Sequence, residues 1–432
     1  MSAFSQASLL HTRDVERTRL DNGLLVLTRE IHASPTVATM LWYRVGSRHE
    51  EPGGTGRSHF LEHMLFKGTR RYGKGEIDLL TMKSGGSNNA FTSYDFTAYY
   101  FNFASDRWQT ALEIEADRMT NTVFEPAEFE AERKVVIEEL KAGLDQPWGA
   151  LMQELNRRAF ERHPYRNPVI GWLEDLEAAT VEDMEQYYRQ HYCPSNATLV
   201  LVGDFETDAA LRKVKAEFDR IPPGEPPALR SSRELPQERE RRFELAWRSS
   251  VPRIAIGYHA PPIGHPDSYA LQVLAAILAD GKASRLYQRL VERDRATTFV
   301  TAEYGEAYDE TLFYIRAESR GGVTPGAIEA AIHDEVQRIA AGGVDAHELD
   351  RARHQIEAHF VFSMERALDQ AMLLGQIQTL STLDYIDEYL PRIAGVDSGH
   401  VKHVCKRYLA PSNRTVGWLF EGPPAGVAEK VG

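Results

Sequence analysis

The chain has 432 residues, 42% of them hydrophobic and 26% charged, which is typical of a globular protein with two or more domains. Its net charge of −13 argues against a nucleic acid partner, because phosphate binding needs a basic surface. No run of about 18 apolar residues is present, so we predict no membrane span, and the first residues lack the pattern of a signal peptide.

The first half of the chain is expected to open with strands and continue with helices. Aliphatic and β-branched residues predict strands at 23–28 and 36–45, followed by a helix at 56–66. A helix-and-strand stretch at 91–103 and two long helices come next. A turn at Pro194-Ser195-Asn196 then leads into the strand that ends this half.

The second half repeats this order after a linker at 222–242, where paired prolines favour a semi-rigid, extended chain. The repeated elements are strands at 242–247 and 253–259, a helix at 267–279, a helix-and-strand stretch at 310–317, two long helices and a strand after Pro411-Ser412-Asn413. The two Pro-Ser-Asn turns lie 411 − 194 = 217 residues apart, about half the chain, which indicates an internal repeat.

This clustering of strands predicts an α+β fold. We expect two similar halves, each a mostly antiparallel sheet with helices packed on one face. The predicted domains are an N-terminal domain at 1–221, the linker at 222–242 and a homologous C-terminal domain at 243–432.

The two cysteines leave the redox compartment open. Cys193 and Cys405 lack the spacing of a metal site, so we expect buried thiols. One disulfide between them is the alternative.

The segment 56–66 carries the chemistry of the first half. We expect a helix that begins with Ser58 as its N-cap. His59 and His63 then lie four residues apart on one face, so both imidazoles can reach one zinc ion. Glu62 lies on the same side and can reach a water molecule at the metal without being a ligand, as in the inverted motif H-x-x-E-H.

Histidines satisfied by core hydrogen bonds are the alternative interpretation of this helix. Its other side chains are mostly apolar, so the motif should be buried. Two buried histidines and a carboxylate within one turn are costly without a shared partner, and a metal ion supplies one.

A third protein ligand is expected in the helical segment 130–140, because a zinc hydrolase combines three protein ligands with an open position for water. Glu132 and Glu139 are seven residues apart and share a face, whereas Glu138 points about 100° away. Glu139 as the ligand and Glu132 as a supporting carboxylate fit one geometry. A solvated acidic helix face is the alternative that periodicity alone leaves open.

These residues closely resemble the pitrilysin-like zinc peptidases, in the branch of the mitochondrial processing peptidase β-subunit and the bacterial two-subunit enzymes. The segment 59–69 is similar to the family's active-site helix, and the separation of 139 − 63 = 76 residues between His63 and Glu139 matches its third ligand. Glu132 matches its supporting glutamate. The segment 85–92 resembles the loop and edge strand against which substrate lies.

The resemblance implies a zinc metalloendopeptidase with one Zn²⁺ per chain, bound by His59, His63 and Glu139. Glu62 takes a proton from water and passes it to the leaving amine, with Glu132 beside it. A closed chamber between two bowl-like halves admits peptides and unfolded segments. The substrate adds as an extended strand along Asn89, Ala90, Phe91 and Thr92.

The second half departs from the family's metal motif. An alignment of Gly281 with Gly68 places other residues opposite His59, Glu62 and His63, so we expect no metal site there. The residues at these positions are Gln272, Ala275 and Ala276.

The second half also lacks a residue pair that the family uses. Family members whose C-terminal half completes an active site carry an Arg and a Tyr seven residues apart, which contact substrate and stabilise the oxyanion. The corresponding positions are Val291 and Thr298, and a different register would offer Arg293 or Arg295. We therefore expect a heterodimer in which a related subunit without the zinc motif supplies the pair.

The sequence thus predicts a zinc-dependent endopeptidase subunit that acts on peptides or unfolded segments. The alternative is a non-catalytic structural or peptide-binding subunit. For the compartment, a periplasmic location with the signal already removed is favoured over the cytoplasm.

Overall fold

The computed structural model describes residues 10–228, 233–248 and 251–422. The chain forms two compact units, and each combines three separate stretches of sequence. The first unit consists of Met1–Leu140, Asn167–Ser231 and Phe360–Asp387. The second consists of Lys141–Arg166, Ser232–His359 and Glu388–Gly432.

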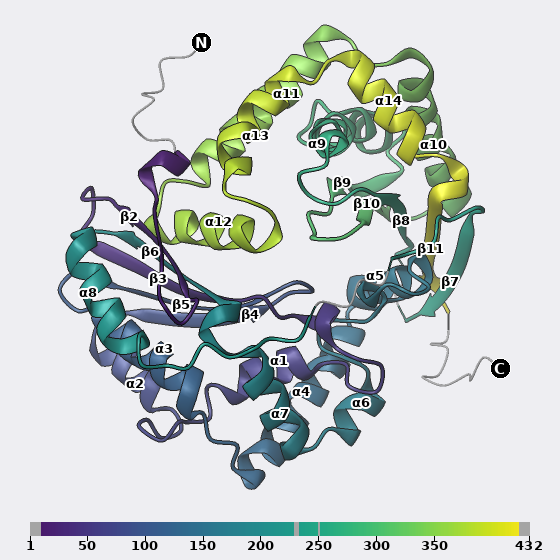
Figure 1. The fold of residues 1–432 in the computed structure, drawn as a ribbon. Coiled ribbons are helices and arrows are strands. Elements are labelled where there is room, and N and C mark those ends of the chain that lie inside the picture. The colour runs from purple at the N-terminus through teal and green to yellow at the C-terminus, as the bar shows by residue number, and fades with distance from the viewer. Residues whose placement is uncertain (1–9, 229–232, 249–250, 423–432) are drawn as a thin grey trace. The chain divides into compact units, whose positions relative to one another are not determined.

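The first unit is built on a six-stranded sheet in the order β1-β2-β6-β3-β5-β4 (Figure 1). Neighbouring strands are antiparallel except β2 and β6, which are parallel. The strands are β1 (Glu16–Arg19), β2 (Leu25–Glu30), β3 (Thr36–Tyr43), β4 (Ser87–Thr92), β5 (Thr97–Ala104) and β6 (Ala197–Gly203).

Helices from three stretches of sequence surround this sheet. They are α1 (Arg57–Met64), α2 (Glu76–Lys83), α3 (Gln109–Asn121), α4 (Pro126–Leu144), α6 (Leu173–Ala178), α7 (Val181–His191), α8 (Thr207–Phe218) and α12 (Ala367–Leu380).

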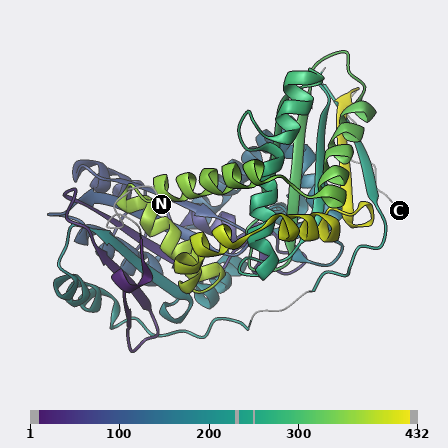
Figure 2. The ribbon, with the colours of Figure 1, turned by 90° about the horizontal axis from the view of Figure 1, so that it is seen from above.

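The second unit is built on a five-stranded sheet in the order β7-β11-β8-β10-β9. Its strands are β7 (Arg241–Trp247), β8 (Arg253–Ala260), β9 (Thr297–Tyr304), β10 (Thr311–Ser319) and β11 (Arg414–Glu421), the last of which is yellow in Figure 2. Its helices are α5 (Pro147–Ala159), α9 (Pro266–Ala279), α10 (Pro325–Gly342), α11 (Ala346–Phe362), α13 (Asp384–Gly395) and α14 (Ser398–Tyr408).

The two sheets repeat one topology. In each, the first strand of the repeat pairs in parallel with the last, which follows a 3-10 turn at Pro194–Asn196 or Pro411–Asn413. The last strand then pairs antiparallel with the second strand of the repeat, and a hairpin completes the sheet. The predicted α+β fold with two similar, mostly antiparallel halves is therefore confirmed.

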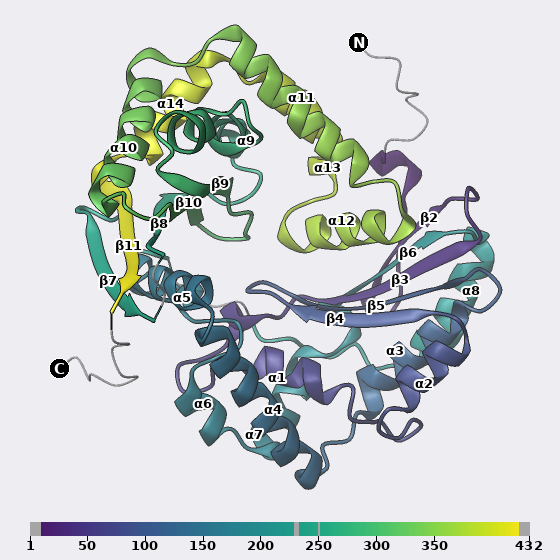
Figure 3. The same cartoon turned by 180° about the vertical axis from the view of Figure 1, so that it is seen from behind.

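Each unit receives one helix from the other half of the chain. Helix α12, from the C-terminal half, packs on β3 and β6 of the first sheet (Figures 1 and 3). Helix α5, from the N-terminal half, packs on β11 and β8 of the second sheet. One crossing between the units falls between the described residues 228 and 233, inside the linker predicted at 222–242. The halves on either side of the linker exchange the segments that carry α5 and α12, so each compact unit contains residues from both halves. The predicted domain limits stay a prediction.

Alternating residues of β3 show how the first sheet is covered on both faces. Trp42 points to α12, where a Cβ atom at Gly375 would lie 2.0 Å from the indole Nε1. Tyr43 points to the other face and stacks on Tyr192 after α7, with ring centroids 4.1 Å apart. The close approach of α12 to the sheet therefore requires glycine at position 375.

A small apolar core holds α5 against the second sheet. Leu151 and Leu155 of α5 are fully buried against three side chains of the sheet, namely Phe243, Ala255 and Leu419.

Most predicted elements form within a few residues of their expected ends. Two predictions were wrong. Residues 91–103 hold the end of β4, a turn and β5, and residues 311–317 belong to β10, so neither predicted helix-and-strand stretch contains a helix. Cys193 and Cys405 are both buried, free thiols, as expected. Within the described ranges, no helix is both long and apolar enough to cross a membrane.

Candidate metal centre

Helix α1 begins differently from the prediction. Its N-cap is Gly56, with a left-handed φ of 86°, and the helix starts at Arg57. The prediction of Ser58 as the N-cap was therefore wrong. Ser58 is the second helical residue, and its hydroxyl lies 2.8 Å from the Tyr187 hydroxyl. The peptide N–H groups of Gly56 and Ser58 both donate to the carboxylate of Glu50, each at 2.7 Å.

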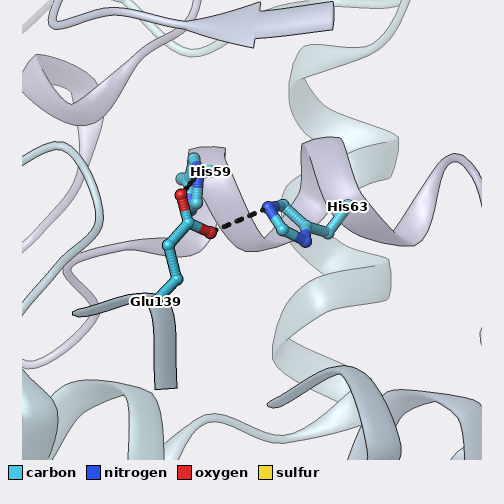
Figure 4. A group of neighbouring side chains, drawn as sticks. All are labelled: His59, His63 and Glu139. Atoms are coloured by element: carbon cyan, nitrogen blue, oxygen red, sulfur yellow. Dashed lines mark ion pairs between the residues drawn. The ribbon is translucent and has the colours of Figure 1, made fainter. Parts of the chain in front are cut away.

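The structure brings together the three predicted zinc ligands, two from α1 and one from α4 (Figure 4). His59 Nε2 lies 3.9 Å from Glu139 Oε1, and His63 Nε2 lies 3.5 Å from Glu139 Oε2. One ligand atom from each of the three residues lies within 4.8 Å of the others. Across the part of the chain that the structure describes, this is the one group of three such residues.

These residues fit a zinc ion. Two ligands of a tetrahedral zinc at about 2.0–2.1 Å stand about 3.3 Å apart, close to the separations seen here. The donors are two imidazoles and a carboxylate, a set that zinc hydrolases use. His59 Nδ1 is buried without a hydrogen-bond partner. The alternative of a core histidine held by hydrogen bonds is therefore disfavoured at His59.

Glu132 fixes the orientation of one ligand. Its Oε1 atom lies 2.9 Å from His63 Nδ1, and its Oε2 atom lies 2.5 Å from Lys67 Nζ. A proton on Nδ1 that is donated to a carboxylate leaves Nε2 free to bind a metal. The buried Glu132 is thus a positioning residue for His63, and Lys67 balances its charge.

Glu62 stands beside the ligands and is held by a hydroxyl. Only 9% of Glu62 is exposed, and Thr92 Oγ1 of β4 donates to Glu62 Oε2 at 2.5 Å. Burial raises the pKa of Glu62, while the Thr92 hydroxyl opposes this shift. A carboxyl with a raised pKa is suited to accept a proton near neutral pH.

The pKa values of the two histidines are shifted in opposite directions. Burial, and then the neighbouring His63, lower the pKa of His59 to about 4, so this imidazole is neutral at pH 7. Burial alone would lower the pKa of His63, but the hydrogen bond and charge of Glu132 outweigh it and raise that pKa. A neutral imidazole is the form that binds zinc, so metal binding must release any proton from His63 Nε2.

The residues predicted to bind substrate lie on the edge strand β4. Antiparallel pairing with β5 continues to Thr92, and Ser93 N–H donates to the Phe96 carbonyl at the turn. By the alternation of antiparallel pairs, the main-chain groups of Ala90 face the free edge. Consistent with this, the Ala90 N–H donates to its neighbour's side chain, Asn89 Oδ1, at 2.9 Å.

The side chains of β4 alternate between the two faces of the sheet. Thr92 faces α1 and Glu62, as its hydrogen bond shows. Phe91 faces the other way and packs edge-on against Trp42, with ring centroids 5.5 Å apart.

The second unit holds other groups at the expected positions. Gln272, Ala275 and Ala276 lie on α9, the helix that follows the second strand of the repeat as α1 does. Gln272 Nε2 donates to Glu306 at 3.2 Å, and the Tyr389 hydroxyl donates to Gln272 Oε1 at 2.5 Å. Amide and phenol groups thus occupy this position in place of metal ligands.

The positions of the missing Arg and Tyr lie around the start of β9. Val291 is in the π-helical turn Tyr287–Arg293, and the Thr298 hydroxyl donates to Glu318 at 3.2 Å. Arg295, between them, is exposed and has a left-handed φ of 48°. The Val291 side chain has no hydrogen-bond donor, and the Thr298 hydroxyl already donates to Glu318, so neither position offers the Arg or Tyr donor of the family.

Three contributions to the site were missed by sequence reasoning. Glu50 lies six residues before Gly56, and no local pattern marks a carboxylate that folds back on a helix start. Lys67 lies four residues after His63, and only its pairing with Glu132 gives it a role. Thr92 was expected to bind substrate, and its contact with Glu62 depends on strand register.

Two sequence models of peptidase family M16 match successive parts of the chain. The model described as "Insulinase (Peptidase family M16)" matches residues 25–172, which include the H-x-x-E-H segment and Glu139. The model described as "Peptidase M16 inactive domain" matches residues 178–356, which include Gln272, Val291 and Thr298.

Individual proteins are similar over nearly the whole chain. A protein of Helicobacter pylori named zinc protease PqqE is 27% identical over 409 residues, covering 94% of this chain and 92% of its own length. An Arabidopsis thaliana protein named probable mitochondrial-processing peptidase subunit beta is 27% identical over 418 residues, covering 94% of this chain and 78% of its own.

Solved structures share the fold. The crystal structure of a protease from Helicobacter pylori has a TM-score of 0.91 at 26% identity and covers 94% of this chain and 99% of its own. A Pseudomonas fluorescens structure titled peptidase M16 inactive domain has a TM-score of 0.87 at 17% identity, covering 95% of this chain and 98% of its own. Because the Pseudomonas fluorescens protein is only 17% identical, its similarity to this chain shows a shared fold and nothing more.

Proposed function

The chain belongs to the M16 family of zinc peptidases, and from this premise we propose that it is a zinc-dependent endopeptidase subunit. The observation that carries the proposal is the convergence of His59, His63 and Glu139 next to a buried carboxylate, Glu62. A zinc ion held there supplies Lewis-acid polarisation of the scissile carbonyl and lowers the pKa of water.

Three residues of the chain are proposed to transfer the proton and to orient the groups at the metal. Glu62 accepts a proton from the attacking water and returns it to the leaving amine. The Thr92 hydroxyl holds one oxygen of Glu62 and leaves the other free for this transfer. Glu132 holds His63 in the orientation that directs Nε2 to the metal.

The substrate is proposed to bind as a strand added to the free edge of β4, along Asn89 to Thr92. Main-chain hydrogen bonds from Ala90 would fix the register of the peptide, with little demand on its side chains. Since β4 also carries Thr92, a peptide on this edge lies beside Glu62. Peptides and unfolded segments, which can become extended, are the substrates that such an edge accepts.

We propose further that a related subunit completes the active site. Val291 and Thr298 replace the Arg and Tyr that the resemblance assigns to oxyanion stabilisation. The Arabidopsis relative is named as the beta subunit of a processing peptidase, which is consistent with a two-subunit enzyme. The partner should lack the zinc motif and carry the Arg/Tyr pair.

A non-catalytic structural or peptide-binding subunit is the second candidate. It is favoured by the family model of an inactive domain that matches residues 178–356. A periplasmic location remains a prediction from the sequence.

The test is hydrolysis of a quenched fluorescent peptide by the zinc-loaded chain, with and without its partner. Glu62→Gln should retain one zinc per chain by elemental analysis and lose turnover by at least about 100-fold, the usual scale of acid-base catalysis. Glu138→Gln, a neighbour of the ligand Glu139, is the matched control and should keep both zinc and activity.

Each outcome bears on one part of the proposal. Turnover by Glu62→Gln at the wild-type rate would overturn the assignment of the base. Strong activity of the chain alone would overturn the need for a partner. Zinc binding without hydrolysis under any of these conditions would support the non-catalytic subunit.

A further inference from the structure

The start of helix α1 has no capping side chain of its own. The N-cap position is Gly56, in a left-handed conformation, and a Cβ atom there would lie 2.4 Å from the Ile170 carbonyl oxygen. Gly171 packs equally closely, since its Cβ atom would lie 2.6 Å from Gly56 Cα. Only glycine fits at either position, so the serine, threonine or aspartate that usually satisfies a helix start cannot be present.

Glu50 takes over this function from outside the helix. One carboxylate oxygen accepts the Gly56 N–H and the other accepts the Ser58 N–H, each at 2.7 Å. Only 7% of Glu50 is exposed, so both bonds are shielded from water. Negative charge at a helix N-terminus is also favoured by the helix dipole.

A second carboxylate holds the residue before the helix. Asp175 Oδ2 accepts the backbone N–H of Thr55 at 3.1 Å and its hydroxyl at 2.5 Å. The Trp172 N–H in turn donates to the Thr55 hydroxyl at 2.9 Å. The chain entering α1 is thus tied at Thr55, Gly56 and Ser58, and the ligand His59 comes next.

The position of α1 decides whether the ligands meet. The helix has eight residues, about two turns, so it carries few hydrogen bonds of its own. His59 and His63 move with this helix, whereas Glu139 belongs to α4. A small shift or rotation of α1 would change the distances from both imidazoles to Glu139.

We infer that Glu50 is a positioning residue for the metal centre, which fixes α1 through its two main-chain N–H groups so that His59 and His63 meet Glu139. The inference rests on the proposed function in taking zinc as the ion. Glu50 is not one of the proposed metal ligands, and its two carboxylate oxygens accept main-chain N–H groups. Its role is the placement of the helix that carries two ligands and the base.

The test compares Glu50→Gln with wild type at pH 8. Burial raises the pKa of Glu50 to about 7, so the carboxylate dominates at that pH in the wild type. A glutamine offers one acceptor oxygen, and its NH₂ group then faces a second N–H donor. Glu50→Asp, which keeps the charge but shortens the side chain, serves as the second variant.

Glu234→Gln is the matched control. Glu234 is also buried, with 3% exposed, and its carboxylate accepts the backbone N–H groups of Glu161, Arg162 and His163 at 2.8–3.0 Å. It lies in the second unit, whose described residues include none of the proposed zinc ligands. The same chemical change there removes similar bonds without touching α1.

Two readouts separate positioning from general stability. Hydrogen exchange of the zinc-free proteins should show the α1 amides exchanging at least about tenfold faster in Glu50→Gln than in wild type. Competition with a chromophoric chelator should show a zinc Kd raised at least about tenfold, the scale for residues that orient ligands. The visible spectrum of the cobalt-substituted variant should also change.

The control and the second variant decide the inference. Glu234→Gln should leave the zinc Kd, the cobalt spectrum and the α1 exchange as in wild type, and Glu50→Asp should behave as Glu50→Gln. An unchanged zinc Kd and an unchanged cobalt spectrum in folded Glu50→Gln would overturn the inference. Failure of the wild type itself to bind one zinc would instead overturn the proposed function.

Discussion

One hydroxyl group links the edge strand to the proposed general base. Thr92 Oγ1 donates to Glu62 Oε2 at 2.5 Å, and it also lies 3.4 Å from the Thr97 hydroxyl. Glu62 is mostly buried, so an oxygen without this donor would lose much of its stabilisation. The position and basicity of Glu62 therefore depend on the same strand that is proposed to bind the peptide.

Thr92→Val keeps the shape of the side chain and removes the donor. We expect kcat to fall by about tenfold or more while KM and zinc content stay close to wild type. Thr92→Ser restores the hydroxyl and should recover most of kcat. The measurement is steady-state hydrolysis of the quenched peptide, with zinc determined on the same samples. A serine variant as slow as the valine variant would argue against the hydrogen bond.

His191, at the end of α7, makes stability depend on pH. Burial lowers its pKa to about 4, below the ordinary value of about 6.5 in the unfolded chain. The stabilisation is therefore complete above pH 6.5 and is lost as the pH falls towards 4. Between pH 7.5 and pH 5, the zinc-free wild type should lose about 2 kcal/mol more unfolding free energy than His191→Gln. Urea unfolding at both pH values measures this, and equal losses would contradict it.

The chemistry of the site was predictable where spacing determines geometry. His59 and His63 at i and i+4, with Glu62 between them, converge on any helix, and a spacing of seven puts Glu132 and Glu139 on one face. Glu50 was not predictable, because its bonds to the helix start arise from the path of a loop. The prediction of Ser58 as the N-cap failed because a capping preference does not reveal an acceptor supplied from elsewhere.

At the level of elements, the approach of α12 to the first sheet depends on one glycine. A Cβ atom at Gly375 would meet the fully buried Trp42 at 2.0 Å, and neither the indole nor the helix has free space. Gly375→Ala should therefore lower the unfolding free energy by about 1–3 kcal/mol, as overpacking does. Gly143→Ala, whose Cβ atom would meet nothing within 4 Å on α4, is the control. It should be neutral or stabilising by up to about 1 kcal/mol.

Thermal unfolding of the two glycine variants measures this difference. A Gly375→Ala protein as stable as Gly143→Ala would show that α12 can withdraw from the sheet at little cost.

The positions of helices and strands along the chain were easier to predict from the sequence than the elements against which they pack. Runs of aliphatic and β-branched residues located β3 and β8, and the Pro-Ser-Asn turns located β6 and β11. The exchange of α5 and α12 was not predictable. An apolar helix face shows that a helix is buried, but it does not identify the sheet that buries it. Leu151 and Leu155 would suit either sheet by composition.

At the scale of the whole molecule, neither half of the sequence holds a complete unit. The first unit takes Phe360–Asp387 from the C-terminal half, and the second takes Lys141–Arg166 from the N-terminal half. A chain cut after Pro227 should therefore stay together as a complex of residues 1–227 and 228–432. Fragment 1–227 expressed alone should aggregate, because the face of β3 that carries Trp42 loses α12.

Co-expression of the two fragments, with a tag on one of them, provides the measurement. Recovery of both in one soluble peak is the expected result. A soluble, zinc-binding fragment 1–227 on its own would contradict the requirement for α12.

The position of α12 late in the sequence also determines when the first unit can be completed during translation. The last of the proposed zinc ligands is Glu139, but the first unit is not complete until Asp387 has been made, 387 − 139 = 248 residues later. At about 5–20 residues per second, translation of this stretch takes on the order of 10–50 s. Throughout that time the nascent chain carries all its proposed metal ligands on an unfinished scaffold. The proposed metal centre therefore gains its complete scaffold long after its last ligand has been translated.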